Sequence, residues 1–179
     1  MYHIQEDKRA QKSAVLILQA LMQCMQDKRY EAITITDICQ ASTVSRATFY
    51  RLFDRKDDVI SWGLDLFCTD FCTHLEGQSI REKLESYFAA WMSNPVMLDL
   101  IVIIHREDIP YESYRKRVDM LEHDFMNMEL SDHHVMILSA IVTSLLTNWA
   151  QSGKKEKPAE LVDIFIKVIG DLNACFTMN

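Results

Sequence analysis

The chain has 179 residues, of which 49% are hydrophobic and 25% are charged, and its formal net charge is -7. This composition is that of a globular protein, and the acidic balance argues against a protein that coats nucleic acid by overall charge. Only four Gly and three Pro are present, which disfavours turn-rich sandwiches and barrels. We therefore expect an all-α fold with about nine helices.

The cysteines and the apolar runs bear on the compartment. Five cysteines form an odd set without a Cys-x-x-Cys pair, which is typical of a reduced protein, and no apolar signal segment opens the sequence. The longest apolar runs fall far short of the roughly 20 residues that a membrane-spanning helix needs. We expect a cytoplasmic protein without a membrane segment.

Three helices are predicted in the first 55 residues. The first covers residues 8–28, where apolar side chains recur at three- and four-residue steps. A capping box formed by Thr34 and Asp37 predicts a short second helix that ends near Ser42. After a tight turn, Ser45 is a good N-cap for a third helix of about two turns. Two short helices joined by a tight turn are typical of a helix-turn-helix DNA reader.

The third predicted helix has two faces. Phe49 and Phe53 lie one turn apart and are expected to point inward, which leaves the polar side chains outward. Arg46 in the first turn is suited to guanine edges, and Tyr50 and Arg51 are suited to phosphate oxygens. The residues that we expect to contact DNA are Thr34, Thr36, Ser45, Arg46, Ala47, Thr48, Tyr50, Arg51 and Lys56.

Positive charge is concentrated at this motif. Residues 1–60 carry nine Lys and Arg against eight Asp and Glu, whereas residues 61–179 carry ten against eighteen. Between Thr43 and Lys56, four basic residues accompany a single acid. The alternative is that these side chains form an ordinary solvated face.

The run from Thr36 through residues 44–53 to Lys56 resembles, without gaps, the N-terminal signature of the tetracycline-repressor (TetR) family. The resemblance covers about residues 8–60. It implies a homodimeric transcriptional regulator that binds a near-palindromic double-stranded DNA operator, foremost a repressor that a small-molecule effector releases. Its C-terminal helices would provide the dimer interface and a ligand pocket. Residues 1–55 are accordingly assigned to a helix-turn-helix DNA-binding domain and residues 56–179 to a helical regulatory and dimerisation domain.

Two positions depart from the family pattern. Thr43 stands where the family usually has Gly in the turn, and a β-branched residue at positive φ is expected to strain it. Leu52 replaces a residue that is often His or Tyr in the family, which removes one contact with the DNA backbone.

The C-terminal part is expected to be a bundle of five or so helices, joined to the first part by a helix over residues 57–75. Capping residues and prolines indicate where its helices begin. These starts are Ser79, Pro95, Pro110, Ser131 and Pro158.

Two sets of apolar residues in this part have candidate functions. The candidate ligand pocket comprises Tyr87, Phe88, Trp91, Met92, Met97, Met120 and Phe125. The candidate dimer interface comprises Ile137, Ile141, Leu145, Trp149, Leu161, Phe165, Val168 and Leu172. For both sets the alternative is that the side chains pack in the core of the monomer.

No metal, cofactor or enzymatic activity is expected. Four histidines lack zinc-site spacing: His105, His123, His133 and His134. Cys68 and Cys72, one turn apart, are expected to be buried thiols rather than a metal or redox site. No nucleophile with a nearby base, Gly-rich phosphate loop or recognisable carboxylate pair is present. The functional alternatives are an activator or coactivator of the same family, and a helical interaction module that no longer binds DNA.

Overall fold

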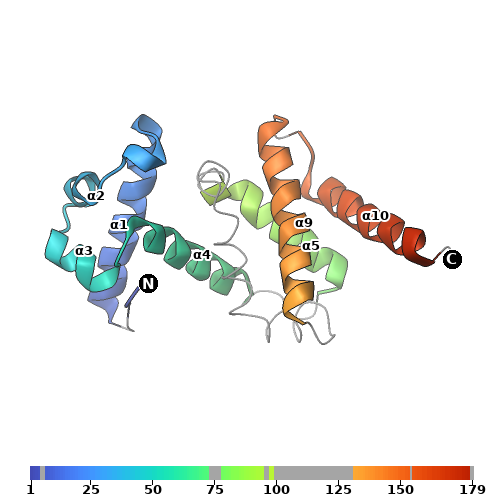
Figure 1. Ribbon diagram of the computed structural model, residues 1–179, viewed down its shortest axis with the longest axis horizontal. Coiled ribbons are helices and arrows are strands. Elements are labelled where there is room, and N and C mark those ends of the chain that lie inside the picture. Colours follow the sequence, from blue (N-terminus) through green and yellow to red (C-terminus); the bar gives the residue numbers. More distant parts are fainter. Residues whose placement is uncertain (5–6, 73–77, 95–96, 99–130, 154, 178–179) are drawn as a thin grey trace. The chain divides into compact units, whose positions relative to one another are not determined.

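The computed structural model describes residues 1–4, 7–72, 78–94, 97–98, 131–153 and 155–177 (Figure 1). Within these ranges the fold is all-α, as predicted, and contains no strand. The helices are α1 (Lys8–Asp27), α2 (Ile35–Ser42), α3 (Arg46–Leu52), α4 (Lys56–Cys72), α5 (Ile80–Ser93), α9 (Asp132–Gln151), α10 (Pro158–Thr177) and one 3₁₀ turn, η1 (Tyr30–Ala32).

Several predictions lie outside the described residues. The helix starts at Pro95 and Pro110 are among them, as are the pocket candidates Met120 and Phe125. None of the helices in the described ranges is both long and apolar enough to cross a membrane.

The chain divides into two compact units, Met1–Phe67 and Cys68–Asn179. The boundary lies inside α4, so this helix contributes residues to both units.

In the first unit, α1 packs against α2 and α3 (Figure 1). The apolar stripe that predicted α1 is buried at Ala14, Ile17 and Leu21, while Ile38 of α2 and Phe49 of α3 are fully enclosed. Because α2 and α3 are too short to persist alone, this shared core holds them in place.

In the second unit, α10 packs against both α5 and α9. Two polar interactions also fix these helices. The Trp149 Nε1 donates to the Glu156 carbonyl oxygen at 3.0 Å, closing the connection between α9 and α10. The Arg81 Nη2 of α5 lies 2.5 Å from the Asp163 Oδ1 of α10.

The predicted caps of α5 and α9 are present. The Glu82 amide donates to the Ser79 Oγ and the Ser79 amide to the Glu82 Oε2, which completes a capping box. At the start of α9, the Ser131 amide donates to the His134 Nδ1 at 3.0 Å. His134 therefore takes the capping role that Glu usually has.

Candidate nucleic-acid interface

The start of α2 is fixed by the predicted capping box. The Asp37 amide donates to the Thr34 Oγ1 at 3.1 Å, and the Thr34 amide donates to the Asp37 Oδ2 at 2.8 Å. The Lys28 Nζ, beyond the end of α1, lies 2.8 Å from the other Asp37 oxygen. This ammonium, together with the Thr34 donors, holds the pKa of the Asp37 carboxyl well below its usual range. The ion pair thus ties the end of α1 to the start of α2.

The turn between α2 and α3 contains a residue in the left-handed region. Thr43 has φ 57° and ψ 18°, and in the part of the chain that is described no other residue except Gly has a positive φ. Thr43 therefore adopts the positive φ on which the predicted strain depends. Such a conformation costs a residue with a Cβ about 1–2 kcal/mol.

The first turn of α3 is fixed by Ser45. The Thr48 amide donates to the Ser45 Oγ at 3.1 Å, and the two hydroxyl oxygens lie 3.0 Å apart. On the inner face, Phe49 and Phe53 are fully buried, with ring centroids 5.7 Å apart. The Phe53 ring also meets Trp62 of α4, edge to face, at 6.1 Å. The inner face of α3 is thereby anchored on α4.

The outer face of α3 carries the predicted DNA-contacting side chains. Arg46, Ala47 and Arg51 are exposed, Thr48 is half-buried, and Tyr50 keeps 47% of its surface exposed. The Arg46 Nη1 donates to the Thr36 Oγ1 of α2 at 3.2 Å, which links the two helices of the motif. The structure thus brings Thr36 and the outward residues of α3 onto one surface. The guanidinium, hydroxyl and methyl groups on this surface are of the kinds that contact base edges and bind phosphates in DNA.

The side chain of Lys56, at the start of α4, is directed toward η1. Its Nζ donates to the carbonyl oxygens of Tyr30 at 2.5 Å, Ile33 at 2.9 Å and Glu31 at 3.4 Å, and lies 4.3 Å from the centroid of the Tyr30 ring. The ammonium is thus engaged with three carbonyl oxygens of η1 and of the residue after it. The predicted phosphate contact of Lys56 finds no support in this geometry.

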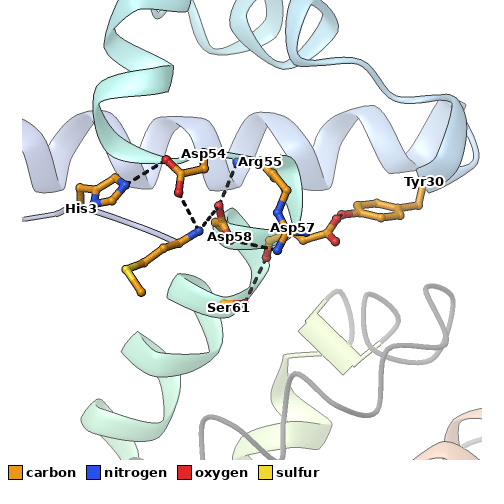
Figure 2. Close-up of polar contacts among 8 residues, drawn as sticks. His3, Tyr30, Asp54, Arg55, Asp57, Asp58 and Ser61 are labelled. Carbon is orange, nitrogen blue, oxygen red and sulfur yellow. Dashed lines mark hydrogen bonds and ion pairs between the residues drawn. The ribbon is translucent and has the colours of Figure 1, made fainter.

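Sequence reasoning did not find the polar network at the junction of α3 and α4 (Figure 2). The His3 Nε2 lies 2.9 Å from the Asp54 Oδ1, and the Met1 ammonium donates to Asp54 and to the buried Asp58. The hydrogen bond with His3 and then that with Met1 lower the pKa of the Asp54 carboxyl. The Arg55 amide donates to the Asp58 Oδ2 at 2.9 Å. The partners of Met1 and His3 lie more than 50 positions away in the sequence, so no local pattern indicates them.

Three of the pocket candidates that the structure describes, Tyr87, Phe88 and Trp91, are in ring contact. Phe88, Trp91 and Met97 are buried, whereas Tyr87 and Met92 are half-buried. The Tyr87 ring meets Phe88 and Trp91 edge to face, at 5.9 and 6.2 Å. The ligand pocket stays a prediction.

The metal and thiol predictions concern side chains that the structure describes only in part. Among the described residues, no group of three or more His, Cys, Asp or Glu side chains is placed to hold a metal ion. Cys68 is buried, and the side chain of Cys72 lies outside the description.

The dimer candidates separate into two groups. Trp149, Leu161 and Phe165 are buried within the second unit, so their packing matches the alternative of a monomer core. Ile137 and Val168 are exposed. Ile141 and Leu145 are half-buried, and the side chain of Leu172 lies outside the description. Further large apolar side chains are exposed on the same two helices: Met136, Ile164, Ile166 and Ile169.

Residues 17–61 match the model of the bacterial regulatory proteins of the tetR family. The chain is similar to the uncharacterized HTH-type transcriptional regulator YxbF of Bacillus subtilis, with 22% identity over 177 residues, covering 92% of this chain and 46% of that protein. It is also similar to the HTH-type dhaKLM operon transcriptional activator DhaS of Lactococcus lactis, with 31% identity over 64 residues, covering 36% of this chain and 33% of the activator. The matches thus span less than half the length of these two relatives.

Solved structures share the fold over nearly the whole chain. Lin0861 from Listeria innocua superposes with a TM-score of 0.83 at 21% identity, covering 95% of this chain and 96% of that one. A TetR transcriptional regulator from Streptococcus agalactiae has a TM-score of 0.64 at 21% identity and covers 92% of this chain and 97% of its own. The helix-turn-helix geometry and the family match agree: residues 17–61 form the N-terminal helix-turn-helix region of the bacterial regulatory proteins of the tetR family, and the chain shares the fold of these solved structures.

Proposed function

We propose that the chain is a homodimeric repressor that binds a near-palindromic DNA operator through α3 and is released by a small-molecule effector. The outer face of α3 is the observation that carries this proposal. Its cationic, hydroxyl and aromatic side chains are exposed on a helix whose inner face is locked by Phe49 and Phe53. A helix of this kind fits the major groove, which is wide enough to admit it and displays a distinct pattern for each base pair.

The outward residues have different proposed roles. Arg46, in the first turn of α3, would donate to a guanine edge, and the methyl groups of Ala47 and Thr48 would meet thymine methyls. Tyr50 and Arg51, on the flank, would donate to phosphate oxygens and fix the register. Lys56 is left out of the proposed interface because its ammonium is engaged with three carbonyls of the protein.

The proposed dimer interface consists of exposed apolar side chains on α9 and α10: Met136, Ile137, Ile164, Ile166, Val168 and Ile169. Ile137 keeps 53% of its surface exposed, an unfavourable state for a large aliphatic side chain that a second copy would relieve. A symmetric dimer uses the same patch on both copies, and two readers spaced by about 34–36 Å, or a multiple of it, match two operator half-sites.

The direction of regulation has a second candidate. The similarity over 64 residues to the activator DhaS favours an activator that uses the same DNA-binding surface. In either case residues 1–55 would bind DNA and residues 56–179 would dimerise and bind the effector, and the protein would act in the cytoplasm. An effector would shift the equilibrium between DNA-binding and released states only through different affinities for the two.

Mobility-shift assays with DNA from the neighbourhood of the gene test the DNA-binding proposal. We expect one fragment to bind, and Arg46→Ala to weaken its binding about tenfold or more, as loss of a base contact worth about 1–3 kcal/mol implies. Lys167→Ala, an exposed cation on α10, serves as the charge-matched control and should bind like the wild type. If no fragment binds at low salt, the proposed function is wrong.

Two further measurements test the dimer and the direction of regulation. In sedimentation we expect a dimer at micromolar concentration, which Ile137→Glu together with Ile169→Glu dissociates. A wild-type monomer under these conditions would rule the dimer out. A transcriptional reporter is placed under the control of the bound fragment, and the gene of this protein is deleted. Reporter expression should rise if the protein is a repressor and fall if it is an activator.

A further inference from the structure

The first residues of the chain pair with the end of α3. The His3 amide donates to the Leu52 carbonyl oxygen at 2.8 Å, the Asp54 amide donates to the Met1 carbonyl oxygen at 3.2 Å, and Tyr2 and Phe53 form an antiparallel bridge. Leu52 is the last residue of α3. The last carbonyls of a helix have no partner within it. Residues 1–4 therefore supply a partner that α3 lacks.

The side chains of the same segment bind both sides of the α3–α4 junction. The Tyr2 hydroxyl donates to the carboxylate of Asp65 in α4, which is only 5% exposed. The His3 ring lies against Asp54, immediately after α3, as Figure 2 shows. A buried carboxylate needs hydrogen-bond donors, so the Tyr2 contact is costly to break. The segment is thus held to α4 through Tyr2 and to the end of α3 through the backbone of His3.

We infer that Tyr2 and His3 are positioning residues for DNA reading, which hold α3 in its orientation against α4. This inference rests on the proposed function. With seven residues, α3 is too short to be stable or to hold its orientation by itself. The side chain of Ser45 caps its first turn. A binding surface loses affinity when its side chains stray by more than about 0.5 Å from the productive geometry. Fixing the far end of α3 therefore bears on how well Arg46 reaches a base.

Two substitutions separate the two attachments. Tyr2→Phe keeps the ring and removes the hydroxyl that binds Asp65. His3→Pro removes the amide donor to Leu52. We expect each substitution to weaken binding of the DNA fragment that the wild-type protein binds by about five- to tenfold. This is the effect of losing one hydrogen bond, to the buried Asp65 carboxylate in the first case and to the Leu52 carbonyl oxygen in the second. His133→Ala, an exposed His on α9, is the control and should leave the affinity unchanged.

A second readout distinguishes positioning from direct contact with DNA. A positioning role leaves the slope of log affinity against log salt at the wild-type value, because no phosphate contact is lost. A fall of about one in that slope would mean that the segment itself binds phosphate, and would overturn the inference. Wild-type affinity in both variants would also overturn it. Affinities are compared at a temperature at which circular dichroism shows variants and wild type equally folded, so a simple loss of stability does not imitate the effect.

Hydrogen exchange keeps the inference testable apart from DNA binding. The Asp54 amide, which donates to Met1, should exchange faster in His3→Pro than in the wild type, while the amides of α1 are unchanged. If the wild type binds no DNA, the proposed function fails, and faster exchange at Asp54 still supports the hold on α3. Unchanged exchange there would refute it.

Discussion

Replacing Lys56 with Met tests the role that the structure gives to this ammonium. Met keeps most of the apolar stem and removes the donor to the carbonyl oxygens of Tyr30 and Ile33, at 2.5 and 2.9 Å, and the charge above the Tyr30 ring. Hydrogen bonds from a charged donor contribute about 1.5–3 kcal/mol, and a cation over an aromatic ring about 0.5–1 kcal/mol. Because the site is half-buried, water can hydrogen-bond to some of the freed carbonyl oxygens, and this offsets part of the lost stabilisation. We expect the free energy of unfolding to fall by about 2 kcal/mol.

Urea and thermal unfolding followed by circular dichroism measure this change. For a chain of this length, about 2 kcal/mol corresponds to a fall of about 4–8 °C in Tm. Lys12→Met is the matched control, since Lys12 is an exposed cation on α1, and it should change stability by less than about 0.5 kcal/mol. The slope of log DNA affinity against log salt should remain that of the wild type.

The opposite pattern would refute the reasoning. If Lys56→Met is as stable as Lys12→Met and the slope of log DNA affinity against log salt falls by about one, Lys56 contacts a DNA phosphate. The role expected from the family motif would then be correct, and the structural role assigned from its hydrogen bonds would be wrong.

Substitutions at three further positions follow from the helix-turn-helix. Thr43→Gly should raise the free energy of unfolding by about 0.5–1 kcal/mol in urea titrations, because relief of the left-handed strain exceeds the entropy that Gly adds to the unfolded chain; a decrease would mean that Thr43 is not strained. Ser45→Ala should cost about 1 kcal/mol and Ser45→Asn little, since Asn also caps; equal losses would exclude capping as the cause. The lowered pKa of Asp37 stabilises the fold in full above the unfolded pKa of about 3.9, and this contribution is lost progressively as the pH falls toward the lower folded pKa. The stability difference between the wild type and Asp37→Asn should therefore be constant above about pH 5 and shrink below about pH 4. A difference that grows in acid would contradict this assignment.

Local interactions made the helix-turn-helix predictable from sequence. The Thr34 box and the Ser45 cap each join residues three positions apart, and Thr43 was indicated because only a few residue types adopt positive φ easily. Lys56 and Tyr30 are 26 positions apart, and Tyr2 and Asp65 are 63 apart. Such pairs depend on how the helices pack, and neither spacing nor periodicity reveals them.

Periodicity also left the apolar faces of α9 and α10 ambiguous. Both helices are apolar over wide arcs, so the sequence pattern alone does not tell an inward side chain from an outward one. The structure buries Trp149 and Phe165 and exposes Ile137 and Val168, although all four were expected on one interface. The buried set includes both aromatic rings, whereas Ile137 and Val168 remain exposed and available for a further surface.

The hydrogen bond from Arg46 to Thr36 gives the motif a degree of pre-organisation. A free arginine samples many rotamers, and immobilising such a side chain on binding costs about 0.5–1.5 kcal/mol. Thr36 restricts Arg46 before any DNA arrives, and it occupies one N–H of a guanidinium that has several. In the proposed complex Arg46 keeps enough donors to meet a guanine edge without releasing Thr36. A side chain on α2 would thus influence which base the neighbouring helix reads, and part of the sequence preference would be set in the free protein.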